Sequence, residues 1–324
     1  VRLWDRYGQF GQFVDVETGE LLVGNSASGS TAVGGLALAS QYTGNADYLR
    51  VARAAGEDYY RRFVCNGYTT GGPGEICQCP DSESAFGLLE SFVALYEVTG
   101  ESKWVEYAQD MAHQCASWVT SYDFVFPPTS LFGRLDIRAA GSVWANAQNK
   151  HGAPGICTLS GDALFKLYRA TGNSFYLELL REIAHSIGQC LSRTDRPIGP
   201  DMPPGWMTER VNLSDWLEGV GEIFPGSCWC EVSLMQTYAE VPGLYVQPDI
   251  GFVWPFDHID AAVVANEPDR IVVELTNPTA FPAAVRAYVE PSSTMQQPLG
   301  QNALWGGQVV HLAAGATACL ELRK

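Results

Sequence analysis

The sequence predicts a mainly α-helical protein in which helical hairpins form a double ring, followed by a small antiparallel β-sandwich domain. Three observations lead to this fold class. A hairpin motif repeats along the chain, apolar and amphipathic helices alternate, and the residue pattern becomes strand-like after Pro248. We therefore expect a helical domain with an N-terminal β-hairpin over residues 1–247 and a β-sandwich domain over residues 248–324.

The repeated motif is an apolar run that ends in Thr-Gly and is soon followed by an aromatic-aliphatic pair. It occurs at residues 38–44, 95–100 and 167–172. Glycine just beyond a helical run is typical of a helix C-cap, because a residue without Cβ readily adopts the left-handed conformation. Each copy predicts two antiparallel helices joined by a tight turn. A weaker copy at residues 236–243 contains Pro242, so we expect that hairpin to stop after its first helix.

The first helix of each hairpin is more apolar than the second, as residues 84–98 and 101–120 illustrate. This alternation suits a double ring with the first helix inside and the second outside. The connections between hairpins are long, and all lead into first helices: residues 65–83, 121–155 and 193–226. Loops of this length are usually functional, and we expect these three to gather at one mouth of the ring.

Composition excludes several classes of function. The chain has 324 residues, of which 46% are hydrophobic and 17% charged, as in a globular protein with a real core. A net charge of −16 without a basic tract argues against nucleic acid as a partner. No apolar run is long enough to span a membrane. The cysteines at 77 and 79, and at 228 and 230, lack histidines at ligand spacing, so we expect no metal and no cofactor.

Two acids, Asp81 and Glu83, stand where the first long connection becomes an apolar helix. Paired carboxylates at such a position can serve as proton donor and as base or nucleophile on a glycosidic bond. The alternative is helix capping, since acids are favoured by the free N–H groups and dipole of a helix N-terminus. Both interpretations stay open from the sequence alone.

Basic and polar residues cluster in the second long connection: Arg138, Asn149, Lys150 and His151. Cationic side chains near the mouth of an acidic protein suit the carboxylate of an acidic sugar. Loop solvation and internal ion pairs are the alternative for each residue taken singly. His151 has little packing reason to lie among Asn and Lys, so we predict a catalytic role for it.

Tryptophans in and near the connections form a third group, with charged neighbours beside them. Aromatic faces can stack on sugar rings, although core packing is the more common role of Trp. The substrate-binding residues predicted from this group are Trp144, Trp206, Arg210, Trp229 and Glu231.

The repeat Tyr-x-x-Thr-Gly-x-x-x-Tyr/Trp-Leu/Val, the alternation of helices and the β tail resemble the six-hairpin glycosidase superfamily of (α/α) toroids. That superfamily includes unsaturated glucuronyl hydrolases and β-glucuronidases. Residues 8–15 and 144–151 look like those of a bacterial group, glycoside hydrolase family 154. A complete toroid has more helices than this sequence predicts. The chain therefore looks like the C-terminal part of a longer protein of this kind. The alternatives are that the ring is open or that a partner completes it.

The resemblance and the site residues predict a glycoside hydrolase that acts on uronic-acid-containing oligo- or polysaccharide. Asp81, Glu83 and His151 would be its catalytic groups. Two alternatives stay open. One is a polysaccharide lyase, which would use His or Tyr as base for β-elimination, and the other is a non-catalytic carbohydrate-binding subunit.

Overall fold

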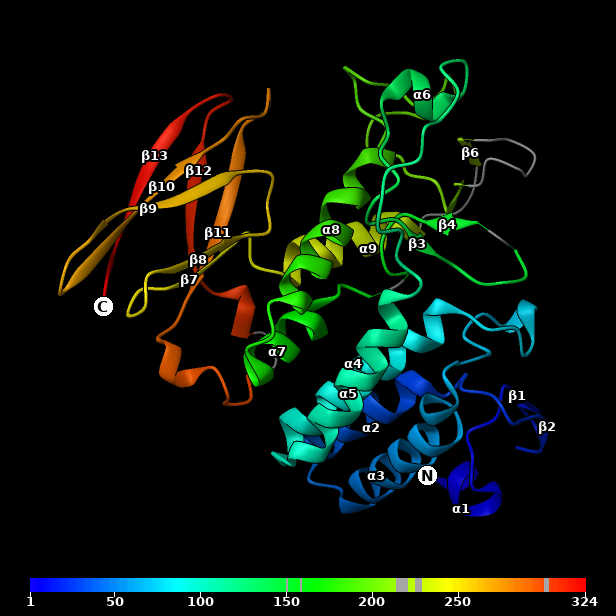
Figure 1. The fold of residues 1–324 in the computed structure, drawn as a ribbon. Helices are drawn as coiled ribbons and strands as arrows, with labels where there is room; N and C mark the ends of the chain where they lie inside the picture. Colours follow the sequence, from blue (N-terminus) through cyan, green and yellow to red (C-terminus); the bar gives the residue numbers. More distant parts are fainter. Residues whose placement is uncertain (150, 158, 214–220, 225–228, 300–302) are drawn as a thin grey trace.

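The computed structural model describes residues 1–149, 151–157, 159–213, 221–224, 229–299 and 303–324. In this part of the chain nine helices hold 40% of the residues, and strands in four small sheets hold 21%. The predicted mainly α toroid with a β-sandwich is therefore wrong. Over the described residues the fold is mixed, with no defined sheet sandwich, and Figure 1 shows hairpins beside separate sheets.

In Figure 1 the helical hairpins lie in the centre and lower part of the view, and the C-terminal strands lie apart from them on the left. α2 packs against both α3 and α4, α4 packs against α5, and α7 packs against α8. α9 leads directly into a strand, as expected for the weak fourth copy of the motif. The helices are α1 (Arg2–Tyr7), α2 (Ser30–Thr43), α3 (Ala46–Arg62), α4 (Ser82–Thr99), α5 (Ser102–Ala116), α6 (Leu131–Leu135), α7 (Asp162–Thr171), α8 (Phe175–Ile187) and α9 (Trp229–Glu240).

The predicted hairpin turns are confirmed, and their Thr-Gly pair has a clear physical role. Gly44, Gly100 and Gly172 are left-handed, with φ of 72°, 68° and 74°, and each amide donates to the carbonyl oxygen four residues earlier. The preceding threonine hydroxyl also donates to a carbonyl oxygen of the helix, as Thr99 does to Leu95 at 2.6 Å. The same hydroxyls accept the amide two residues later, in all three turns. The motif thus satisfies backbone groups that a helix end leaves unpaired.

One large core cluster lies among the helices. Fully buried side chains of α4, α5 and α7 meet there, including Phe92, Trp104 and Leu164. The rings of Phe92 and Trp104 stack with centroids 6.2 Å apart. The first helix is the more apolar one in the hairpins α2–α3 and α4–α5, as expected. In the third hairpin the expectation is wrong, because α8 is more apolar than α7 and buries most of its own residues. No described helix is both long and apolar enough to cross a membrane.

The N-terminal residues form the predicted β-hairpin, preceded by α1, which the sequence did not predict. β1 (Phe13–Val14) and β2 (Leu21–Val23) pair antiparallel. The left-handed glycine Gly8 ends α1, and its amide donates to the carbonyl oxygen of Trp4.

The C-terminal strands make two sheets. One has the order β13-β10-β9, and the other has the order β12-β11-β7-β8 with β7 parallel to β11. Apolar residues of both sheets share one cluster, which includes Val246, Val273 and Val285. The strands are β7 (Leu244–Gln247), β8 (Phe252–Pro255), β9 (Asp260–Asn266), β10 (Arg270–Thr276), β11 (Ala283–Val289), β12 (Gln308–Leu312) and β13 (Thr317–Arg323).

The fourth sheet consists of residues from the long connections. It contains β3 (Val143–Trp144), β4 (Gly152–Ala153), β5 (Arg210–Asn212) and β6 (Glu222–Phe224), in that order. The hairpin motif specifies how two helices turn, but it says nothing about the arrangement of successive hairpins. The connections that we expected to be loops also carry strands, which is a second reason why the predicted class was wrong.

Candidate functional site

The three long connections meet around a cavity of about 290 Å³, which we call the loop cavity. Its size is close to the lower limit for small-molecule sites. It lies at the N-terminal end of α4, beside the small sheet made by the connections. Its charged, imidazole and amide side chains are those of Glu83, Asn146, Asn149, His151, Glu209 and Arg210.

The two predicted acids of the first connection have separate positions. Asp81 is fully buried and is the N-cap of α4. Its Oδ1 accepts the amide of Ser84 at 2.6 Å, while its Oδ2 accepts the Ser84 hydroxyl at 2.9 Å and the Gly72 amide at 3.1 Å. Burial raises the pKa of Asp81, and these hydrogen bonds act in the opposite direction. Glu83, in the first turn of α4, lines the cavity instead. Asp81 therefore has the geometry of the capping alternative, and Glu83 that of a cavity acid.

Backbone contacts hold the second connection against this helix end. Asp81 and Asn146 form an isolated antiparallel bridge, and the Ser82 amide donates to the carbonyl oxygen of Ala145 at 3.0 Å. The buried Asn146 accepts the amide of Asn149 through its Oδ1 at 2.7 Å. These contacts place Asn149 and His151 at the same cavity as Glu83.

The third connection adds Glu209 and Arg210. Arg210 begins β5, whose next residue, Val211, pairs with Gly152 of β4. The thiol of Cys230 lies 3.5 Å from the carbonyl oxygen of Glu209, and burial raises the pKa of that thiol. The loop cavity thus joins segments from all three connections, as the sequence predicted, although no ring surrounds it over the described residues.

Four other predicted site residues do not line the cavity. Trp144 packs against an apolar cluster, and Trp206 is half-buried with its carbonyl oxygen bound to the Ser192 amide at 2.8 Å. The Oε1 of Glu231 accepts the Met207 amide at 2.8 Å. Arg138 is exposed and forms an ion pair with Asp123 at 3.3 Å. Lys150 and the side chain of Trp229 lie outside the described residues.

Sequence reasoning missed Glu209, which brings a second carboxylate to the cavity. A signal was present, because Glu209 lies beside Arg210 in a segment already singled out for its tryptophan. The pairing that brings it near Glu83 joins residues more than a hundred positions apart, and no local pattern encodes such a contact.

Gly72 allows the close approach of the first connection to α4. A Cβ at this position would lie 2.4 Å from Oδ1 of Asp81 and 2.8 Å from the Ser84 amide nitrogen. We expect Gly72→Ala to lower the free energy of unfolding by about 1–3 kcal/mol, because the cap of α4 must shift. Gly35→Ala is the control, since a Cβ there meets open space on helix α2. Chemical denaturation of both variants checks this, and equal effects would contradict it.

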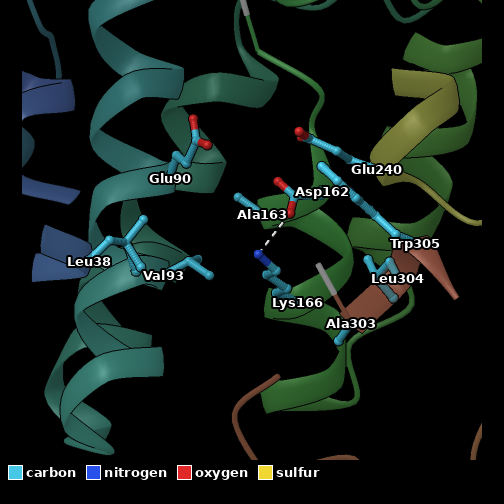
Figure 2. A pocket seen from close by; sticks show the side chains of 11 residues that line it. Leu38, Glu90, Val93, Asp162, Ala163, Lys166, Glu240, Ala303, Leu304 and Trp305 are labelled. Atoms are coloured by element: carbon cyan, nitrogen blue, oxygen red, sulfur yellow. Dashed lines mark ion pairs between the residues drawn. The ribbon is translucent and has the colours of Figure 1, made fainter. Parts of the chain in front are cut away.

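A second cavity, of about 110 Å³, lies between α4 and α7, and we call it the acidic cavity. Figure 2 shows Glu90 of α4 across this space from Asp162 and Lys166 of α7, with Glu240 of α9 on the third side. Lys166 Nζ lies 2.7 Å from Oδ2 of Asp162. Burial, followed by the negative charge of Asp162, raises the pKa of Glu90 to about 7. The only sequence signal for this cavity is that Glu90 interrupts an otherwise apolar stretch of α4.

The raised pKa of Glu90 makes stability depend on pH. The folded protein holds this proton more tightly than the unfolded chain does, so the stabilisation is complete below about pH 4.5 and is lost as pH rises through about 7. We expect Glu90→Gln to be more stable than wild type above neutral pH, by on the order of 3 kcal/mol. The difference should vanish in acid. Thermal denaturation across pH checks this, with exposed Glu106→Gln as the control.

No protein-family model and no curated protein matches this sequence. The chemistry of the loop cavity is therefore interpreted from its own residues. It combines two carboxyl groups with an imidazole, a guanidinium and amide groups.

Proposed function

We propose that the protein is a glycoside hydrolase that acts on uronic-acid-containing oligo- or polysaccharide at the loop cavity. The observation that supports this most is that Glu83 and Glu209 line one cavity with Arg210 and His151. Hydrolysis of a glycosidic bond generally uses two carboxyl groups, one as acid and the other as base or nucleophile. The guanidinium of Arg210 suits the negatively charged carboxylate of the substrate.

In this proposal Glu83 is the principal acid/base group, and Glu209 is the second carboxylate. Arg210 binds the uronate carboxylate, for which its planar guanidinium is well shaped. His151 supplies an imidazole as a further general acid or base, and Asn149 bonds sugar hydroxyls. Asp81 is a positioning residue, because it fixes the first turn of α4 from which Glu83 projects.

One observation also favours a polysaccharide lyase. His151, Asn149 and Arg210 line the same cavity, and a lyase needs a base together with groups that neutralise the substrate carboxylate. The two reactions differ in their products. A lyase leaves an unsaturated uronide that absorbs ultraviolet light, whereas a hydrolase adds water and leaves no double bond.

The test is to incubate the 324-residue protein with aryl glycosides, aryl uronides and uronate-containing oligosaccharides. We expect release of a reducing sugar, or of the phenol from an aryl glycoside, without formation of an unsaturated sugar that absorbs ultraviolet light. Unsaturated products would support the lyase instead. Saturable sugar binding without any turnover would contradict both enzymes and support a binding subunit.

A further inference from the structure

A third and larger cavity, of about 520 Å³, lies between the helical hairpins and the C-terminal strands. We call it the interface cavity. The end of α8, the chain after it and one residue of α9 form one side, and the turns before β9 and β11 form the other. Its volume lies within the range of small-molecule sites. The residues of the proposed glycosidase site are not among those that line it.

Two arginines of the chain after α8 line the interface cavity. Arg193 forms a bidentate ion pair with Asp195, through Nε at 3.0 Å and Nη2 at 2.8 Å. This pair leaves Nη1 outside the contact. The guanidinium carbon lies 4.6 Å from the centroid of the Phe281 ring, which belongs to the opposite side. Arg193 is thus held across the cavity by an acid and an aromatic ring.

Arg196 adds a donor that lacks an acceptor. Its Nη1 and Nη2 donate to backbone carbonyl oxygens of Leu135 and Gln189. Within the described part of the chain, its Nε is buried without a hydrogen-bond partner. A buried donor in this state carries a desolvation cost that an anionic acceptor would relieve.

A pair of histidines completes the polar lining. The rings of His185 and His258 stack with centroids 4.1 Å apart. Nε2 of His185 lies 2.9 Å from the carbonyl oxygen of Phe256, and because a carbonyl only accepts, this nitrogen carries the proton. Burial lowers the pKa of both rings. One acid, Asp257, stands among these groups, and burial raises its pKa to about 6.

The remaining lining is largely apolar. Leu191 and Ile259 face the cavity from the two sides, and Phe281, Pro282, Ala283 and Ala284 continue the strand side. The side chain of Asn277 holds this side in place, since its Nδ2 donates to the carbonyl oxygens of Phe281 at 2.7 Å and Ala313 at 3.1 Å. A bare inorganic anion would leave these apolar surfaces unused.

We infer that the interface cavity binds a small organic carboxylate with an apolar body. The carboxylate is held by Arg193 and Arg196, and the body packs against Phe281, Leu191 and Ile259. Guanidinium groups match the geometry of a carboxylate, and the apolar lining matches the rest of such a ligand. This site stands independently of the proposed glycosidase activity.

The test uses isothermal titration calorimetry with three probes: phenylacetate, its neutral amide phenylacetamide, and inorganic phosphate. We expect phenylacetate to bind, and the other two to bind at least about tenfold more weakly. If the amide bound equally well, the site would not recognise the negative charge. If phosphate bound equally well, the site would not recognise the apolar part of the ligand. Either result, or no binding of phenylacetate, overturns the inference, and none of these comparisons needs a variant.

Two arginine variants locate the binding. Arg193→Gln is expected to weaken phenylacetate binding about tenfold, whereas Arg210→Gln, in the loop cavity, leaves it unchanged. The opposite pattern would place the ligand in the loop cavity and overturn the inference. Unchanged binding in both variants would overturn it as well.

Discussion

Replacing Glu83 by Gln is expected to lower kcat/KM on a uronide substrate about a thousandfold or more, while the protein stays folded. The amide keeps the size of the side chain but removes the proton-transferring carboxyl group. Glu83 lines the loop cavity from the first turn of α4, where the helix end favours a negative charge without requiring one. Steady-state kinetics and circular dichroism of wild type and variant provide the measurement.

Asp81→Asn is the matched comparison for Glu83→Gln, because the two residues share one turn and differ in burial. Asn is also a good N-cap, although its amide group cannot accept the Gly72 amide as the carboxylate Oδ2 does. We expect a loss of about 1 kcal/mol in stability and a loss of activity much smaller than that of Glu83→Gln. If Asp81→Asn abolished turnover and Glu83→Gln retained it, the assigned roles would be reversed.

The second large effect is expected at Arg169, where Arg169→Met should lower the free energy of unfolding by about 3–5 kcal/mol. Arg169 of α7 binds Glu290 through two hydrogen bonds, both 2.6 Å long. The two side chains are only 3% and 6% exposed. The Tyr245 hydroxyl also donates to Glu290, at 2.8 Å. Loss of the arginine leaves a buried carboxylate without its counter-charge. Denaturant unfolding of wild type and variant measures the resulting loss of stability.

Two further variants separate pairing from burial. Arg169→Met combined with Glu290→Met removes both charges, so we expect it to recover part of the lost stability. Lys103→Met breaks the half-exposed pair with Glu57, whose Nζ–Oε1 distance is also 2.6 Å, and should cost no more than about 1 kcal/mol. A cost as large at Lys103 as at Arg169 would show that burial is not the deciding factor.

The sequence predicted those parts of the fold that depend on neighbouring residues. The Thr-Gly turns are local, since a threonine hydroxyl and a glycine amide satisfy carbonyl oxygens within four residues, and all three hairpins were found. The arrangement of hairpins depends on contacts between distant segments. The parallel pairing of β7 with β11, for example, has no signature in either strand. The predicted toroid therefore extended a correct local pattern beyond what that pattern determines.

The candidate site was predicted to a similar extent. Glu83, Asn149, His151 and Arg210 line one cavity. The signal that suggested a functional role for them was the unusual length of the connections that carry them. Burial was the property that sequence could not supply. Asp81 looks like Glu83 in the sequence, whereas the structure shows it buried and accepting the Ser84 amide as the cap of α4.

The bridge between Asp81 and Asn146 also limits how this site can be moved to another scaffold. Grafting one connection would transfer one carboxylate without its neighbours, since the opposing groups belong to segments sixty and more positions away along the chain. A transplant would need all three segments and the helix end against which they rest. The chemistry of this cavity belongs to the assembled architecture, and no excised peptide carries it.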